Sequence, residues 1–305
     1  MIEARQLTKR YGDKTAVDGV DFTVHPGAVT GFLGPNGAGK STTMRMIIGL
    51  DAPTSGTVTV NGRRYAGHSA PLHEVGALLE ARSIHPGRSA FDHLMALAYT
   101  HGIPKARVTE VIELTGLQSV AGKRAGAFSL GMGQRLGIAA ALLGDPQTIM
   151  LDEPVNGLDP DGVLWIRNLL TGLAAEGRTV FISSHLMSEM ALVADHLIVV
   201  GRGRVLADTT VQDLVRRAGG DTVLVATADP AGLRRVLAGP GVEITGSPGS
   251  ERLSVTGLPA RAIGLRAAEH GIALFELTDK TVSLEEAFME LTKESVEYHS
   301  TARAA

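Results

Sequence analysis

Residues 34–41 have the sequence G-P-N-G-A-G-K-S, which matches the phosphate-binding pattern G-x-x-x-x-G-K-[ST]. An apolar run at 28–33 precedes this loop, and a helix is expected from about Lys40. A strand, a glycine-rich turn and a helix suit such a loop, because backbone N–H groups and the helix N-terminus together surround a phosphate. We therefore expect Lys40 to contact the β- and γ-phosphates of a nucleotide and Ser41 to bind Mg²⁺.

Two further motifs place polar side chains directly after an apolar strand pattern. The first, T-I-M-L-D-E-P at 148–154, contains Asp152 and Glu153, and the second, F-I-S-S-H at 181–185, ends in His185. In open α/β sheets ligands bind at the carboxyl ends of the strands, where the loop at 34–41 is also expected. We predict that Asp152 binds Mg²⁺, that Glu153 orients or deprotonates a water, and that His185 reaches the γ-phosphate or that water.

The apolar runs of residues 1–219 alternate with helical patterns, which predicts an α/β fold with a parallel sheet. Strands are expected at 28–33, 56–60, 148–151, 179–183 and 196–200, and helices at 161–175 and near 186–193. The segment 89–143 differs, because it contains helical patterns at about 90–100, 105–115 and 131–143 with no clear strand between them. It is therefore predicted to be a helical subdomain inserted in the α/β domain.

A second pattern begins after Gly219, so we predict a separate C-terminal domain at 220–305. Its expected order is β-α-β-β-α-β, the order of a small ferredoxin-like α+β unit. The strands are expected at 222–228, 242–245, 253–256 and 272–277, and the helices at 231–237 and 260–270. A last helix is expected after Ser283, which forms a capping-box pattern with Glu286.

The composition limits the classes of function. The 305 residues carry a net charge of −3, and neither predicted domain has a marked excess of basic residues, which argues against a nucleic-acid partner. There is no cysteine, hence no disulfide and no thiolate metal site, as expected for a cytosolic protein. No apolar run approaches the roughly 20 residues that cross a bilayer, so a membrane process would need a separate chain.

Together these motifs resemble those of the ATP-binding subunits of ABC transporters, a family of P-loop ATPases. Residues 34–42 are similar to the Walker A loop of that family, and 149–154 to its Walker B strand. N-G-L-D-P at 156–160 resembles its D-loop, with Asp159 as the matching residue, and His185 matches its switch histidine. The resemblance covers about residues 2–217 and implies an ATP-binding segment made of Gly34, Pro35, Asn36, Gly37, Ala38, Gly39, Lys40, Ser41 and Thr42.

The stretch F-S-L-G-M-G-Q-R-L at 128–136 resembles the family signature L-S-G-G-Q. Ser129 and Gly131 are kept, whereas Leu130 and Met132 replace the first glycine and the glutamine of the signature. In this family the signature contacts the ATP that the other subunit binds. The resemblance therefore implies a two-fold symmetric homodimer in which Ser129 and Gly131 face the nucleotide of the partner.

For two residues, the role implied by the resemblance stands beside a second interpretation without a functional role. Tyr11 lies where the family places an aromatic residue that stacks on adenine, but it is also compatible with an ordinary half-buried tyrosine. Glu80 occupies the place of the Q-loop glutamine, where it is a possible Mg²⁺ ligand or a simple surface residue. Glu80, Met132 and the added C-terminal domain are together similar to the drug- and antibiotic-export branch, of the bacitracin- and daunorubicin-resistance type.

The resemblance thus implies an ATPase subunit that uses ATP and Mg²⁺ to drive a separate membrane permease, with the chain peripheral at the inner face of the cell membrane. A second hypothesis is an ABC ATPase that acts on ribosomes or DNA. Such proteins usually carry paired ATPase units or long basic inserts, and neither is present in this sequence. A third hypothesis, a nucleotide switch without hydrolysis, is disfavoured by the intact set of Lys40, Asp152, Glu153 and His185.

Overall fold

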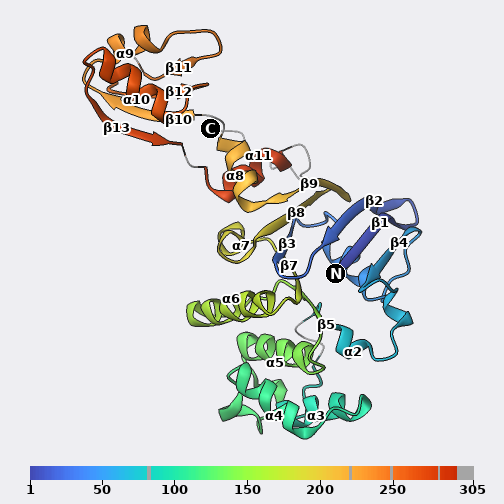
Figure 1. Ribbon diagram of the computed structural model, residues 1–305. Coiled ribbons are helices and arrows are strands. Elements are labelled where there is room, and N and C mark those ends of the chain that lie inside the picture. Colours follow the sequence, from blue (N-terminus) through green and yellow to red (C-terminus); the bar gives the residue numbers. More distant parts are fainter. Residues whose placement is uncertain (81–83, 220–221, 248–249, 281, 294–305) are drawn as a thin grey trace, which may run out of the picture. The chain divides into compact units, whose positions relative to one another are not determined.

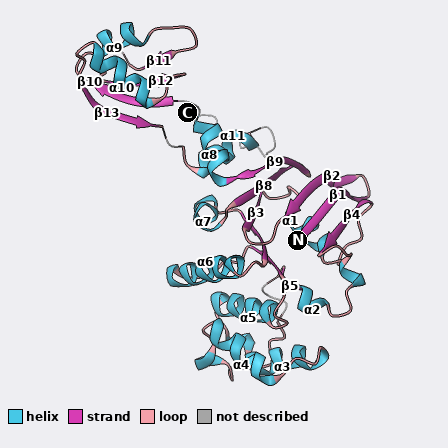
Figure 2. Cartoon of the chain, in the orientation of Figure 1, coloured by secondary structure: helices cyan, strands magenta, loops and turns pink. Residues whose placement is uncertain are grey.

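The computed structural model describes residues 1–305 except 81–83, 220–221, 248–249, 281 and 294–305 (Figures 1 and 2). The chain forms two compact units, Met1–Thr210 and Val211–Leu291, which are described separately. The helix α8 (Val211–Gly219) groups with the second unit, whereas the sequence pattern places it before the boundary. The boundary at Gly219 stays a prediction.

A six-stranded sheet forms the centre of the first unit, with strand order β5-β6-β7-β3-β8-β9. Its strands are β3 (Val29–Leu33), β5 (Val75–Leu78), β6 (Thr148–Asp152), β7 (Thr179–Ser184), β8 (His196–Gly201) and β9 (Arg204–Thr210). All neighbours are parallel except β8 and β9. Leu33 pairs with Ser184 and Asp152 pairs with Ser183, so β3, β6 and β7 present their carboxyl ends side by side.

A three-stranded antiparallel sheet, in the order β2-β1-β4, packs against the central sheet. It consists of β1 (Ile2–Tyr11), β2 (Lys14–Val24) and β4 (Ser55–Val60). Phe22 of β2 lies 5.8 Å from Phe32 and 6.0 Å from Phe181 between ring centroids, which joins the two sheets in one core. The sequence pattern does not reveal β1 and β2, because bulges and the positive φ of Gln6 interrupt the alternation of apolar and polar residues.

Helices cover the central sheet and form the predicted helical subdomain. Those of the α/β core are α1 (Lys40–Ile47), α2 (Pro71–Glu74), α6 (Pro160–Ala175) and α7 (Met187–Val193). The subdomain contains α3 (Ala90–Thr100), α4 (Lys105–Leu114) and α5 (Leu130–Leu142), which pack on one another (Figure 1). The three helices predicted between 89 and 143 are therefore confirmed within one residue at each end.

The single tryptophan, Trp165 of α6, connects the helical subdomain with the core. Its indole Nε1–H donates a hydrogen bond of 3.0 Å to the carbonyl of Leu114 at the end of α4. The guanidinium of Arg135 on α5 lies 4.2 Å from the centre of the indole ring and donates to the carbonyl of Thr115. One side chain thus holds α4, α5 and α6 together.

The second unit has the predicted β-α-β-β-α-β order, followed by a helix (Figure 2). Its elements after α8 are β10 (Thr222–Thr227), α9 (Pro230–Leu237), β11 (Glu243–Thr245), β12 (Arg252–Thr256), α10 (Ala260–Glu269), β13 (Leu274–Asp279) and α11 (Leu284–Thr292). The strands form an antiparallel sheet in the order β11-β12-β10-β13 over a small apolar core. Ser283 and Glu286 exchange backbone and side-chain hydrogen bonds, so the predicted capping box is present.

In the described part of the chain, no helix has the length and apolar character required to cross a membrane.

Candidate active site

The loop at 34–41 connects β3 to α1, as the sequence predicts. Two of its glycines are required by close approaches of the backbone. A Cβ on Gly34 would lie 2.4 Å from the carbonyl oxygen of Val200, and one on Gly39 would lie 2.5 Å from that of Ala16. Gly39 also has a φ of +100°, which larger residues rarely adopt. The loop is thus fitted tightly against β8 and β2.

Lys40 folds back over this loop and is only 8% exposed. Its Nζ donates hydrogen bonds to the carbonyl oxygens of Gly34 at 2.6 Å and Pro35 at 3.3 Å. Burial lowers the pKa of the Lys40 ammonium, and the negative charges of Glu153 and Asp152 oppose this shift. An anion bound in the loop would favour the protonated ammonium still further.

Ser41 and Asp152 meet at the carboxyl end of β6, where their side chains are joined by a hydrogen bond of 2.8 Å from Oγ to Oδ2. The other carboxylate oxygen of Asp152 accepts a hydrogen bond from the hydroxyl of Ser183. A hydroxyl and a carboxylate are hard oxygen ligands of the kind that Mg²⁺ prefers, and Mg²⁺ usually takes its remaining ligands from phosphates and water. The residues therefore fit a Mg²⁺ ion bound together with a nucleotide.

Glu153 follows Asp152 in a left-handed backbone conformation, with a φ of +51°. Its N–H contacts both the carbonyl oxygen and the Oγ of Ser183, at 3.2 and 3.1 Å. Its side chain is 22% exposed and lies 2.7 Å from His185, between Oε2 and Nδ1. A carboxylate beside a phosphate loop, held by a histidine, is suited to orient and deprotonate a water.

A cavity of about 420 Å³ brings most of these residues together. It is lined by Tyr11, Lys14, Ala16, Pro35, Asn36, Gly37, Ala38, Gly39, Lys40, Ser41, Thr42, Asp152 and Glu153. Lys14 and Ala16 were missed by the sequence analysis, because it did not recognise β2 as an element. Their position shortly after Tyr11, across the turn between β1 and β2, is the sequence signal that could have placed them near the nucleotide.

Tyr11 stands at the mouth of the cavity and is 49% exposed. Its hydroxyl donates to Asp51 Oδ2 at 3.1 Å, and the same oxygen accepts from Arg45 Nε at 2.8 Å. The hydrogen bond from Arg45 is the main reason that the pKa of Asp51 lies below its ordinary value, so this carboxylate remains an acceptor. Asp51 and Arg45 thereby fix an exposed aromatic ring beside the phosphate loop.

The signature stretch begins α5 and touches the segment 156–160 of the same chain. Ser129 is the N-cap of α5 and accepts a hydrogen bond of 3.2 Å from the N–H of Met132. A Cβ on Gly131 would lie 2.7 Å from the carbonyl oxygen of Gly157, and a Cβ on Gly157 would lie 2.4 Å from the side chain of Leu130. Gly131 is therefore needed for packing within its own chain.

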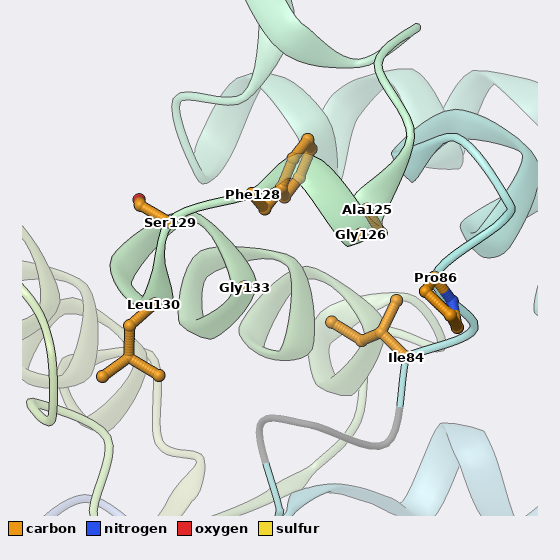
Figure 3. A pocket seen from close by; sticks show the side chains of 8 residues that line it. All are labelled: Ile84, Pro86, Ala125, Gly126, Phe128, Ser129, Leu130 and Gly133. Carbon is orange, nitrogen blue, oxygen red and sulfur yellow. The ribbon is translucent and has the colours of Figure 1, made fainter.

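Ser129, Gly131 and Asp159 are not among the residues described as lining the cavity. Asp159 caps α6 by accepting a hydrogen bond from the N–H of Gly162 at 2.9 Å. Ser129 borders a different cavity, of about 290 Å³, which opens beside the start of α5 with Ile84 and Pro86 opposite (Figure 3). Ser129 thus borders a cavity other than the one that contains the phosphate loop of its own chain.

Glu80 is exposed after the end of β5 and is not part of the described lining of the phosphate cavity. Its charge contributes to the raised pKa of Arg45, although the hydrogen bond to Asp51 is the larger cause. Residues 81–83, which follow it, lie outside the described part of the chain. A contribution of Glu80 to metal binding stays a prediction.

Residues 17–156 match the ABC transporter family. The bacitracin transport ATP-binding protein BcrA of Bacillus licheniformis is 41% identical over 220 residues, which cover 71% of this chain and 72% of that protein. The chain belongs to the ABC transporter family of ATP-binding proteins. It is therefore an ATP-binding subunit with ATPase activity, and the predicted resemblance is confirmed.

Other comparisons extend this ABC ATPase assignment. An uncharacterized ABC transporter ATP-binding protein, YhcH of Bacillus subtilis strain 168, is 36% identical and aligns over 97% of both chains. A solved ATP-binding subunit of an ABC transporter is similar with a TM-score of 0.66 and 28% identity, over 72% of this chain and 93% of the other. Residues 221–285 match a domain of unknown function (DUF8746).

The fold is also that of an ATP-binding cassette solved as a dimer in a post-hydrolysis state with ADP and Pi. That structure has a TM-score of 0.63 and 24% identity, over 69% of this chain and 98% of the other, so it supports the fold alone. A bacterial ABC transporter cassette whose solved structure is dimeric is similar with a TM-score of 0.63 and 25% identity. ABC ATPase subunits form dimers and work with membrane permease components.

Proposed function

We propose that this ABC ATPase hydrolyses ATP between two copies of the chain and thereby drives a separate membrane permease that exports an antibiotic or another lipophilic compound. The catalytic part of the proposal rests on the hydrogen bond of 2.7 Å between Glu153 Oε2 and His185 Nδ1, because Glu153 lines the cavity that contains the phosphate loop. The ATP-binding segment from Gly34 to Thr42 holds the phosphates through backbone N–H groups, and Lys40 adds a positive charge.

Ser41 and Asp152 are the proposed ligands of Mg²⁺, because their oxygens already lie together at the end of the phosphate loop. Bound Mg²⁺ neutralises negative charge on the β- and γ-phosphates. Glu153 accepts the proton of the attacking water, and His185 holds the carboxylate through Nδ1 and presents its other ring nitrogen to the γ-phosphate. Tyr11 offers the face of its ring to adenine.

The homodimer is proposed because the signature residues do not contribute to the described lining of the phosphate cavity in their own chain. Ser129, Gly131 and Asp159 are absent from the described lining of the cavity that contains Lys40. A two-fold axis would place these residues of each copy against the ATP held by the other copy. Closure of such a dimer on ATP, and its opening after hydrolysis, would move a permease at the inner face of the cell membrane.

Export of antibiotics is the part of the proposal that rests on relatives. Beside the bacitracin transport protein, a linearmycin resistance ATP-binding protein of Bacillus subtilis strain 168 is 37% identical over 232 residues. Both names describe the handling of an antibiotic. The chemistry of the cargo would be selected by the permease, because the ATPase site recognises only nucleotide.

The variant Glu153→Gln tests the catalytic proposal, because it keeps the size of the side chain and removes the base. We expect it to bind ATP as the wild type does and to hydrolyse ATP at least roughly 100-fold more slowly. It should accumulate as an ATP-bound dimer on gel filtration. Glu176→Gln, an exposed residue at the end of α6, is the matched control and should behave as the wild type. Normal turnover by Glu153→Gln, or isolation of the chain with ribosomes instead of membranes, would contradict the proposal.

A further inference from the structure

Gln134 is a polar residue of α5 whose side chain is buried. Its side chain is 2% exposed, and its amide Nε2 donates a hydrogen bond of 3.1 Å to the backbone carbonyl of Glu153. The contact joins residues that are 19 positions apart in the sequence. A buried amide in such a place is retained only if it is hydrogen-bonded, since an unpaired polar group in a protein interior is costly.

The acceptor of this bond belongs to a strained turn. Glu153 has a φ of +51°, a conformation that residues with a Cβ seldom adopt and that surrounding contacts must hold. Ser183 binds its N–H from one side, while Gln134 and the N–H of Asn156, at 3.2 Å, bind its carbonyl from the other. Both peptide groups of Glu153 are therefore clamped, and the direction of the carboxylate follows from this clamp.

We propose that Gln134 is a positioning residue for catalysis: its buried amide holds the left-handed turn at Glu153 and so aims the carboxylate at His185 and the attacking water. The inference rests on the proposed role of Glu153. It also gives α5 a second purpose, because the helix capped by the signature residue Ser129 contacts, through Gln134, the backbone carbonyl of the catalytic Glu153 in its own chain.

The bond can be removed without leaving the carbonyl of Glu153 unpaired, because Asn156 continues to donate to it. Gln134→Met has a similar length, is apolar and fits a buried site, so folding should be retained. The turn would then be held by fewer contacts and would sample other directions of the carboxylate. A small displacement of a catalytic group costs rate, whereas nucleotide affinity depends on the phosphate loop.

The test compares full-length wild type, Gln134→Met and Leu136→Met, a fully buried apolar neighbour on α5 that serves as the control. ATP affinity is measured by titration, and the hydrolysis rate by single-turnover assays in which the protein is in excess over Mg-ATP. We expect Gln134→Met to keep the melting temperature of the wild type and an ATP affinity within about twofold of it. Its hydrolysis rate should fall roughly 10- to 100-fold. Leu136→Met should retain both.

The same substitution in a Glu153→Gln chain identifies the route of the effect. If Gln134 acts through the carboxylate, Gln134→Met should cause no further loss of rate there, since the group that it aims is already removed. An equal loss in both backgrounds would overturn the proposal, as would an unchanged rate in the single variant.

Three further outcomes bear on this inference, and the first two separate it from the proposed function. If Glu153→Gln is inactive while Gln134→Met turns over normally, only the role of Gln134 is wrong. If Glu153→Gln turns over normally, the role of Glu153 is wrong, and the inference that depends on it is wrong as well. If both Gln134→Met and Gln134→Leu fail to fold, Gln134 is a structural residue and the proposal is overturned.

Discussion

The imidazole of His185 and the carboxylate of Glu153 form one hydrogen-bonded unit, in which Nδ1 lies 2.7 Å from Oε2. An ionised carboxylate can only accept, so Nδ1 carries the proton of this bond and Nε2 is left for another partner. The histidine side chain is half exposed, which leaves Nε2 accessible from the solvent side of the site.

This pairing predicts that two different substitutions of His185 should lower the rate of hydrolysis equally. The amide nitrogen of an asparagine can replace Nδ1 but nothing in it replaces Nε2. We expect His185→Asn to hydrolyse ATP as poorly as His185→Ala, roughly 100-fold below the wild type, with ATP affinity retained. Steady-state rates with purified chain and Mg-ATP decide the matter. Substantial activity in His185→Asn alone would mean that the histidine acts only by holding Glu153.

Ser129 allows a test of the dimer in which helix capping is preserved. Aspartate caps helices about as well as serine, so Ser129→Asp should fold normally while adding a negative charge where the phosphate of the partner is proposed to lie. In a Glu153→Gln background we expect this charge to prevent the ATP-dependent dimer on gel filtration, with ATP affinity of the monomer unchanged. Ser129→Thr keeps the hydroxyl and should still dimerise. A dimer formed by both variants would place the signature outside the interface.

The lowered pKa of Lys40 predicts that ATP binding takes up protons in alkaline solution. Between that lowered pKa and the ordinary lysine value of 10.5, part of the free protein carries a neutral Lys40, and the bound phosphates restore the charge. Calorimetric titrations in buffers of different ionisation enthalpy would measure this uptake. Lys40→Arg should show none, because a guanidinium stays protonated there. Equal proton uptake by both proteins would assign the effect to another group.

The contact between Leu130 and Gly157 predicts coupled effects on stability. Gly157→Ala places a Cβ in a backbone of φ +77° and 2.4 Å from Leu130, so we expect a loss of unfolding free energy of about 2 kcal/mol or more. Leu130→Ala alone should cost less than about 0.5 kcal/mol, since this side chain is 52% exposed. The double variant should recover the part due to the clash and keep the part due to φ. Strictly additive values in urea unfolding would show that the two residues do not touch.

Much of this site could be predicted because its residues directly follow strands and helices whose apolar residues recur at a regular spacing. The apolar strands before Gly34, Asp152 and His185 are buried and parallel, so their carboxyl ends had to meet at one edge of the sheet. Of the three helices between 89 and 143, α3 and α5 begin after a capping serine, Ser89 and Ser129, and the apolar positions of all three follow a helical spacing. Local pattern and spacing were sufficient for these elements.

The remaining features depend on contacts between segments that are distant in the sequence, and the spacing of apolar residues does not indicate such contacts. Bulges in β1 hid the strand that positions Tyr11. Ser183 precedes His185 by two positions, yet only the pairing of β6 with β7 brings it to Asp152 and Glu153. The partner of Gln134 is a backbone carbonyl, so no residue type at either position could have indicated the bond.

The place of Trp165 has a practical consequence. Because the chain contains one tryptophan, its tryptophan fluorescence comes from a single indole whose N–H donates a hydrogen bond to the end of α4 and whose ring lies against Arg135 of α5. A rotation of the helical subdomain against α6 would change the polarity around that ring. The native protein therefore contains its own optical reporter for movement of the helical subdomain against α6, and no label needs to be attached.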